Sequence, residues 1–456
     1  MDFKTAPTWV VLGNYAQQYG GIARFWLMFR PCIALNDPKS IHQVLSDPDP
    51  GARSAGTDTR RCPLHNNPIY KFYKDQPRKA LRPMLTDTNT FEAAVSDENW
   101  RDLKQNDPFS MDYCRDWLAS QIDPLQTFLE NGIEELVAES AVQGDLLAYD
   151  VLQKLTFDGF SLATVGQVFP NEVFEQFNTM CETGTIRMTR STLTNWMIPQ
   201  TPHDRTYQKA SKAWFERFDW VVRQQQPPAN SLLDWVARKG GTNFDAQKLR
   251  NFCAGVYPGG AVSTPSAIAS VLHLLDRHPE VRDALRLEIE DLWATPLTLE
   301  RLETCPQLDR VLRESLRLLP AVPFFMRSVN RHKATELAGH SIPANTPIFM
   351  SNWYLQRLSD RWSEPEIFNP SRWDEETCRQ NDWGSDYFFP FGRGSRACIG
   401  QHFARYFIKL TLAVLLAKYE VIFADRPNSS SDDREFFFGV AVPRQLRAKF
   451  VASGSH

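Results

Sequence analysis

The sequence predicts a mainly α-helical protein with a minor β portion, folded as one large domain over residues 1–456. Three observations lead to this prediction. Most of the chain between residues 100 and 293 carries apolar residues at three- and four-residue spacings, the period of an amphipathic helix. Alternating, strand-like segments are short and lie towards the two ends. No linker or repeat divides the chain, and its 42% hydrophobic content can fill one large core. We expect the ends, residues 1–20 and 452–456, to be flexible.

The first elements are predicted over residues 23–47. Two strands are expected around a turn at Arg30–Pro31, followed by a helix that begins at "DPKS", residues 37–40. Residues 51–98 are rich in Pro, Asn, Asp and Thr, which predicts a long irregular excursion with short helices. Long loops in compact domains are usually functional.

Helices dominate the middle of the chain and return near its end. Two short loops, at residues 227–230 and 239–243, separate successive helices. Strand-like alternation follows at 324–353 and again at 419–452. The predicted helices cover residues 131–142, 150–169, 207–226, 231–239, 279–293, 308–319 and 400–419.

Composition excludes several classes of function. A formal net charge of −3 provides no basic field, so nucleic acid is not an expected partner. The start of the chain holds no apolar segment long enough to span a membrane, nor a signal-peptide pattern. The eight cysteines are scattered without a C-x-x-C pair, which argues against a zinc site and a disulfide framework. We expect a reduced, cytoplasmic protein, and a monomer.

The segment "FGRGSRACIG", residues 391–400, carries the strongest chemical signal. A lone cysteine such as Cys398 is often only a small buried hydrophobe. Here it precedes a helix, whose free N–H groups and positive dipole end stabilise a thiolate. Gly392, Gly394 and Gly400 allow unusual backbone angles and close approach of a flat ligand. With Arg396 as a cation for a carboxylate, these are the groups that haem iron ligation needs.

This segment resembles the Phe-x-x-Gly-x-Arg-x-Cys-x-Gly signature of the cytochrome P450 haem-thiolate enzymes. Its five fixed positions are filled by Phe391, Gly394, Arg396, Cys398 and Gly400. The resemblance covers nearly the whole chain. It implies a haem b held between a long distal helix and the cysteine loop, with iron bound by the Cys398 thiolate and with Phe391, Arg396 and Gly400 contacting the cofactor.

Further motifs support this resemblance. "ESLR" places Glu314 and Arg317 on one helix face, where a surface ion pair would be the ordinary interpretation. In the family this pair joins an arginine downstream, here Arg372, in a buried lock that holds the cysteine loop. The resemblance also implies four partners for the haem propionates: Trp100, Lys104, Arg327 and Arg396.

The distal helix should contain "GGAVST", residues 259–264, where relatives commonly show Ala/Gly-Gly-x-Asp/Glu-Thr-Thr. Gly260 then borders the cofactor, and Ser263 and Thr264 are the candidate catalytic hydroxyls for delivering protons to bound dioxygen. Val262 replaces the acid and cannot relay a proton. The hydroxyls could instead only bond to the preceding helical turn. Pro265, inside the helix, predicts a kink there and carbonyls free to bind water or substrate.

The resemblance implies a monooxygenase that activates dioxygen to oxidise a mostly apolar small molecule, in a role that could be biosynthetic. Electrons would come from a separate ferredoxin or flavin reductase, docking on the face around Cys398 and Arg393. Two alternatives stay open: chemistry without hydroxylation (peroxide use, coupling, desaturation or rearrangement) and a non-catalytic haem sensor. The expected pocket residues are Val256, Val262, Phe324, Phe325, Phe437 and Phe438, although core packing is the more frequent role for the last two.

Overall fold

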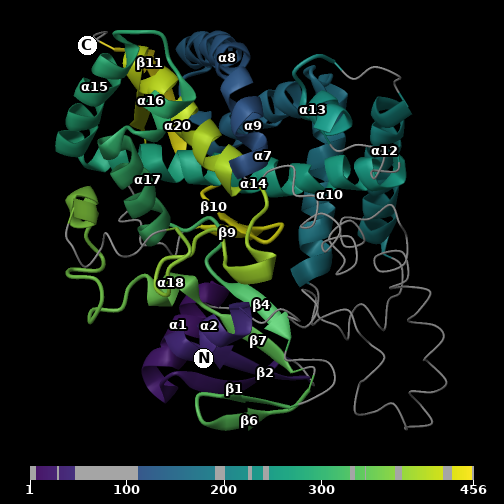
Figure 1. Cartoon of the computed structure of the whole chain (residues 1–456), viewed down its shortest axis with the longest axis vertical. Helices are drawn as coiled ribbons and strands as arrows, with labels where there is room; N and C mark the ends of the chain where they lie inside the picture. The colour runs from purple at the N-terminus through teal and green to yellow at the C-terminus, as the bar shows by residue number, and fades with distance from the viewer. Residues whose placement is uncertain are drawn as a thin grey trace.

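The computed structural model confirms a mainly helical chain with small sheets. Its helices fill the upper part of the view in Figure 1, and a sheet with the N-terminus lies at the lower end. The structure describes residues 7–27, 30–46, 111–189, 201–223, 228–239, 246–328, 334–344, 346–374, 383–424 and 434–453. None of the helices in these ranges is both long and apolar enough to cross a membrane.

The helical part is organised around α14 (Ala246–Arg277), which crosses the centre of the molecule in Figure 1. It packs against α9, α12, α17 and α20. Its Tyr257 is fully buried among aromatic rings of α9 and α12, and such edge-on ring contacts hold the helices in register. The other helices of this part are α7 (Met111–Ser120), α8 (Ile122–Gln143), α9 (Ala148–Val165), α10 (Asn171–Thr189), α12 (Pro202–Arg223), α13 (Leu232–Lys239), α15 (Pro279–Trp293), α16 (Leu299–Glu303), α17 (Pro306–Leu318) and α20 (Gln401–Lys418).

The largest sheet has the strand order β1-β2-β7-β4. Strands β2 and β7 run parallel, and the other neighbours are antiparallel. Helices α1 (Thr8–Tyr19), α2 (Pro38–Ser46) and α18 (Asn352–Leu355) lie beside it in Figure 1. The strands are β1 (Ile22–Leu27), β2 (Arg30–Leu35), β4 (Phe325–Ser328) and β7 (Pro347–Met350).

Three smaller sheets complete the β portion. One has the order β3-β11-β8, and the others are the hairpins β9–β10 and β5–β6. The strands are β3 (Leu146–Leu147), β5 (Thr335–Leu337), β6 (His340–Ile342), β8 (Tyr419–Phe423), β9 (Glu435–Phe437), β10 (Val440–Val442) and β11 (Arg447–Ala452).

One local prediction near the N-terminus was wrong. The turn of the first hairpin does not lie at Arg30–Pro31, because Leu27 pairs with Arg30 and both Arg30 and Pro31 belong to β2. Residues 8–19, expected within a flexible end, form α1, whose Trp9 and Leu12 are buried. Burial of these apolar side chains against the sheet outweighs the absence of a side-chain N-cap. The excursion predicted at 51–98 lies outside the described residues.

Candidate active site

The cysteine loop is a rigid turn. The N–H of Cys398 donates to the Phe391 carbonyl at 2.7 Å, and the N–H of Gly392 donates to Phe389 at 2.8 Å. Gly392 and Gly394 both adopt left-handed backbone angles, with φ of +71° and +70°. A side chain at Gly394 would also collide with the Leu45 carbonyl of α2. The loop can therefore lie this close to α2 only if residue 394 is glycine.

Gly400 behaves differently from the prediction. Its φ of −89° is accessible to any residue, so an unusual backbone angle is not the reason for a glycine there. A Cβ at this position would meet no atom within 4 Å, which leaves open space at the start of α20. Gly400 is the N-cap of α20, two residues after Cys398.

Exposure distinguishes Cys398 from the other cysteines that the structure describes. Five of these six are buried, and Cys398 alone is partly accessible. It stands near the N-terminus of α20, where unpaired N–H groups favour a thiolate. A sulfur atom that is accessible, held by a stiff turn and placed near a helix N-terminus fits the role of an axial iron ligand.

One face of α14 is open in the middle of an otherwise buried helix. Between Cys253 and Asp276, only Val256, Gly259, Gly260 and Ser263 are not buried. These positions follow the i, i+3, i+4, i+7 spacing of a single helix face. Gly259 has nothing within 4 Å of a built Cβ and so leaves space for a flat group, whereas a Cβ at Gly260 would lie 3.5 Å from the Phe160 ring. We call these four residues the open face of α14.

The two candidate hydroxyls differ in their surroundings. Ser263 lies on the open face, and its Oγ donates to the Gly259 carbonyl at 2.5 Å. This is the hydrogen bond to the preceding helical turn that was the alternative to a catalytic role. Thr264 is 5% exposed and Val262 is fully buried in the helical core, so both are less accessible than Ser263. The catalytic roles of Ser263 and Thr264 and the pocket role of Val262 stay predictions.

The two prolines inside α14 do not interrupt it. Pro258 cannot donate to the carbonyl of Ala254, and the indole N–H of Trp214 in α12 occupies that carbonyl at 3.2 Å instead. The hydroxyl of Tyr149 in α9 donates to the Val262 carbonyl at 3.3 Å, next to the turn disturbed by Pro265. A neighbouring helix therefore satisfies the carbonyl left by Pro258, whereas the expectation of free carbonyls at Pro265 stays a prediction.

Glu314, Arg317 and Arg372 come together as the motifs predicted. The Glu314 carboxylate has no exposed surface and accepts from Arg317 Nε, Arg317 Nη2 and Arg372 Nε, each at 2.9 Å. It also accepts from the main-chain N–H of Asn369 at 3.0 Å and from Trp373 Nε1 at 3.1 Å. Trp373 was not among the predicted site residues, although its place beside Arg372 was a usable signal. Five donors fix this carboxylate between α17 and the turn Pro370–Asp374.

Two of the four expected propionate partners can be located. Arg396 is 5% exposed in the loop and Arg327 is 4% exposed on β4, so both are nearly buried cations. Arg327 already donates to the Met326 carbonyl at 2.8 Å, and a haem carboxylate beside either arginine would add a charge-assisted hydrogen bond. Trp100 and Lys104 lie outside the described residues.

The expected aromatic pocket is divided among different parts of the fold. Phe324 stacks with Phe349 in the cluster around the large sheet. Phe325 borders Gly392 of the cysteine loop, 3.7 Å from a Cβ built there. Phe437 and Phe438 are buried in the helical core, as the packing interpretation favoured.

Phe438 has a strained backbone. Its φ is +46°, which is an outlier for a bulky residue. Its N–H donates to Thr185 Oγ1 of α10 at 2.8 Å, and its ring contacts Gly184 of the same helix. The hairpin β9–β10 is thereby attached to α10.

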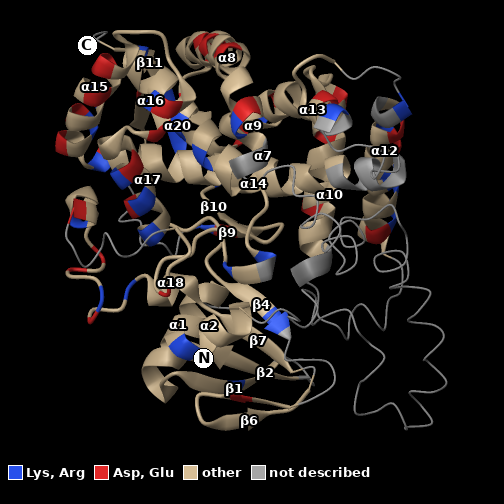
Figure 2. Ribbon diagram, viewed as in Figure 1, with Lys and Arg blue, Asp and Glu red and all other residues tan. Residues whose placement is uncertain are grey.

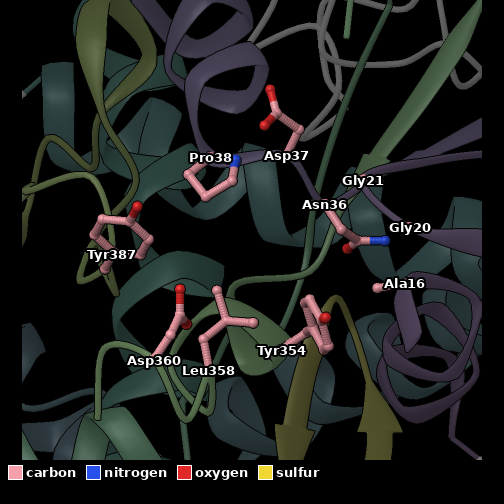
Figure 3. A pocket seen from close by; sticks show the side chains of 10 residues that line it. All are labelled: Ala16, Gly20, Gly21, Asn36, Asp37, Pro38, Tyr354, Leu358, Asp360 and Tyr387. Atoms are coloured by element: carbon pink, nitrogen blue, oxygen red, sulfur yellow. The ribbon is translucent and has the colours of Figure 1, made fainter.

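A cavity of about 260 Å³ lies apart from these groups, between the end of α1, the start of α2 and the region of α18. Figure 3 shows Asp37, Tyr354, Asp360 and Tyr387 among its walls. None of the residues predicted for the active site lines it.

Comparisons with known proteins agree with this site. The model of the family "Cytochrome P450" matches residues 147–447. The mitochondrial 1,25-dihydroxyvitamin D(3) 24-hydroxylase of Mus musculus is 24% identical over 96% of this chain and 83% of its own length. The cyclooctat-9-en-7-ol 5-monooxygenase of Streptomyces melanosporofaciens is 29% identical over 48% of this chain and 49% of its own length.

Solved structures show the same fold. Retinoic acid-bound cyanobacterial CYP120A1 has a TM-score of 0.75 at 20% identity and covers 99% of this chain and 96% of its own. The cytochrome P450DA haem domain has a TM-score of 0.75 at 19% identity, over 97% of this chain and 92% of its own. Together with the family match and the cysteine loop, they show that the chain belongs to the cytochrome P450 family, as a haem-thiolate monooxygenase.

Proposed function

We propose that the haem of this monooxygenase lies between the cysteine loop and the open face of α14, with Cys398 as the axial ligand. One observation carries this assignment: Cys398 is the accessible cysteine among the six described, at the end of a turn closed by its own N–H bond to Phe391. When bound, haem iron supplies the activation of dioxygen and the transfer of one oxygen atom to a C–H bond.

The residues of this chain bind and orient around that cofactor. Arg396 and Arg327 are proposed to pair with its propionates, and their burial makes each such ion pair strong. Gly259, with no atom within 4 Å of a built Cβ, would leave room for the cofactor. We prefer Ser263 to Thr264 for the proton supply, since Ser263 lies on the open face, whereas Thr264 is buried. The Ser263 hydroxyl donates its own proton to the Gly259 carbonyl, so its role would be to accept a hydrogen bond from a water molecule that delivers the proton.

The decisive test is the absorption spectrum of the reduced protein under carbon monoxide. Wild type should show the red-shifted band of a thiolate-ligated haem. Cys398→Ala should lose that band, whereas Cys305→Ala, which changes a buried cysteine of the α17 N-cap, should keep it. A wild-type protein that takes up no haem, or a Cys398→Ala protein with an unchanged band, would refute the assignment.

A mostly apolar small molecule is the proposed substrate, oxidised with electrons from a separate ferredoxin or flavin reductase. Relatives are named for 1,25-dihydroxyvitamin D(3) and cyclooctat-9-en-7-ol, and a structural neighbour for bound retinoic acid, which supports a small organic substrate. Arg393, on the expected docking face, is already paired with Asp386, so its charge is partly compensated. Substrates can be screened by the spin-state shift they cause in the ferric protein.

Peroxide as the oxidant is a second candidate. Val262 in place of the acid and the bond from Ser263 to Gly259 both weaken the usual proton supply. Product formation with labelled dioxygen and a reductase, compared with hydrogen peroxide alone, separates the two. Ser263→Ala should reduce the reductase-driven yield more than Thr264→Ala does. Equal effects would contradict our choice of Ser263.

Location and assembly are also proposals. The scattered cysteines favour the cytoplasm, although the mouse relative is named as mitochondrial, and cell fractionation can decide between them. We propose a monomer, which light scattering of the purified holoenzyme tests directly.

A further inference from the structure

Two arginines from different helices converge on one tryptophan beside the cysteine loop. The guanidinium carbon of Arg313 (α17) lies over the Trp383 ring, 4.7 Å from its centroid, and that of Arg405 (α20) lies 4.9 Å from it. Both distances are within the range of cation–π attraction. We propose that these three residues, the Trp383 cluster, position the cysteine loop and hold positive charge beside the Cys398 thiolate. This inference rests on the proposed role of Cys398.

The cluster is connected to Cys398 through Phe391. The rings of Trp383 and Phe391 are 5.6 Å apart at an interplanar angle of 53°. Phe391 is in turn the residue whose carbonyl accepts the N–H of Cys398 at 2.7 Å. A displacement of the indole therefore changes the packing of Phe391 and, with it, the hydrogen bond that closes the loop around the sulfur.

The cluster also joins the two helices that flank the loop. Arg313 precedes Glu314 of the buried lock, and α20 begins three residues after Cys398. Helices α17 and α20 pack against each other, and Figure 2 shows basic residues on both, together with acidic residues on α17. Contacts of Trp383 with residues of both helices would resist any separation of lock and loop.

The charge around the cluster is positive. Arg313 pairs with Asp309 at 2.6 Å, and Asp309 pairs with the buried Lys409 of α20 at 2.9 Å. Burial would raise the pKa of Asp309, but Lys409 and Arg313 outweigh it and lower the pKa, so the carboxylate stays ionised. The Asp309 carboxylate thus faces two cations, Arg313 and Lys409. Arg405, which is hydrogen-bonded to His402 at 2.9 Å, adds a third positive charge.

Such charge has a measurable effect on a haem thiolate. A nearby cation stabilises the additional negative charge of the reduced iron centre, and so raises the ferric–ferrous midpoint potential. If Trp383 acted only by filling space, the effect of replacing it would depend on side-chain volume. Replacing an arginine of the cluster would then have no effect. Replacing an arginine by methionine tests this difference, because methionine keeps an apolar stem and removes the charge.

The experiment uses haem-loaded protein and two readouts that need no substrate. The first is the rate at which the reduced carbon monoxide complex converts from the thiolate band to the thiol band in mild urea. The second is the ferric–ferrous midpoint potential, measured against a reference dye. In Arg405→Met and in Trp383→Leu, the thiolate band should convert to the thiol band about 3- to 10-fold faster than in wild type. This is the change expected for the loss of a partly buried cation–π contact.

The potential should fall in Arg405→Met, because a positive charge is lost. A tenfold change in the reduction equilibrium corresponds to about 59 mV for one electron, and we expect a change of about two- to tenfold. Trp383→Phe, which keeps an aromatic face, should be intermediate in conversion rate and covers the case that Trp383→Leu fails to fold. The matched control is Arg361→Met, since Arg361 stacks on Tyr387 at 4.5 Å but is half-exposed.

Arg361→Met should behave as wild type. If Arg405→Met showed the conversion rate and the midpoint potential of wild type, the inference would be overturned, even if Trp383→Leu were affected. Trp383 would then act by its volume alone. A wild-type protein without the thiolate band would instead overturn the proposed function, before any variant is compared.

Discussion

Removing the charge of Glu314 is expected to be the most damaging single change in the lock. Glu314→Gln keeps the shape but leaves only one accepting oxygen. In either orientation its amide N–H₂ then faces at least two of the five donors that now bind the carboxylate. Arg317 and Arg372, at 0% and 3% exposure, would remain as uncompensated buried cations.

The expected cost follows from this geometry. Breaking a buried ion pair on one side destabilises by about 3–5 kcal/mol. That is a large fraction of the roughly 5–15 kcal/mol by which a folded protein is stable. Trp373→Phe removes only one neutral donor to the same carboxylate and should cost about 1.5–3 kcal/mol. The exposed pair of Glu216 and Lys212, 3.7 Å apart, provides the control, and Glu216→Gln should cost less than about 1 kcal/mol.

Urea unfolding followed by far-UV circular dichroism measures all three variants. Haem occupancy must be matched among the samples, because cofactor binding itself raises the apparent stability. The expected order of loss is Glu314→Gln, then Trp373→Phe, then Glu216→Gln. If Glu314→Gln lost no more than the surface control, the assignment of a buried, charge-dependent lock would be refuted.

Three further outcomes follow from the fold. Gly394→Ala should lose haem and soluble yield, while Gly339→Ala, with the same left-handed backbone but open space around it, should cost only about 1–2 kcal/mol in urea unfolding; equal losses would contradict the steric argument. Trp214→Phe should lower the stability by about 1–3 kcal/mol, because it leaves the Ala254 carbonyl of α14 unsatisfied. The control Trp220→Phe, at a side chain that is 53% exposed, should cost much less. The reverse order would refute the idea that Trp214 replaces the hydrogen bond that Pro258 cannot make. Burial and the neighbouring Arg277 lower the pKa of His273 to about 4, so the unfolded chain binds its proton first and stability should fall as the pH drops from about 6.5 to about 4. That loss amounts to about 3 kcal/mol, and His273→Gln should remove it from the pH profile of unfolding; an unchanged profile would exclude His273 as its source.

Local patterns predicted some helices closely, but gave no separate range for α7 or α10, and the range 131–142 covers only part of α8. The helix predicted at 279–293 has the bounds of α15, and the one at 400–419 differs from α20 by one residue at each end. In α15 the buried residues Leu285, Ile289 and Leu292 follow the apolar spacing, whereas α20 is buried on all sides from Tyr406 to Leu416. The first hairpin turn was misplaced because proline favoured a turn at Arg30–Pro31, while strand pairing places both residues in β2.

The active site was predictable where its residues are close in sequence. The cysteine loop and the Glu314–Arg317 pair each lie within about ten residues, so their spacing reflects their geometry directly. The aromatic pocket was less predictable. Consecutive phenylalanines such as Phe437 and Phe438 can face a ligand or the core, and only the packing of the hairpin against α10 shows that these two are buried.

The sequence by itself determined the family, the haem-thiolate chemistry and the identity of the candidate ligand, because these depend on a short run of residues with fixed spacing. The tertiary structure decided which four residues of α14 remain open, which carbonyl Trp214 satisfies, and that Arg313 and Arg405 meet at Trp383. These contacts join residues far apart in the chain. They form only when separate helices pack, and burial of side chains from several elements at once leaves no local pattern in the sequence.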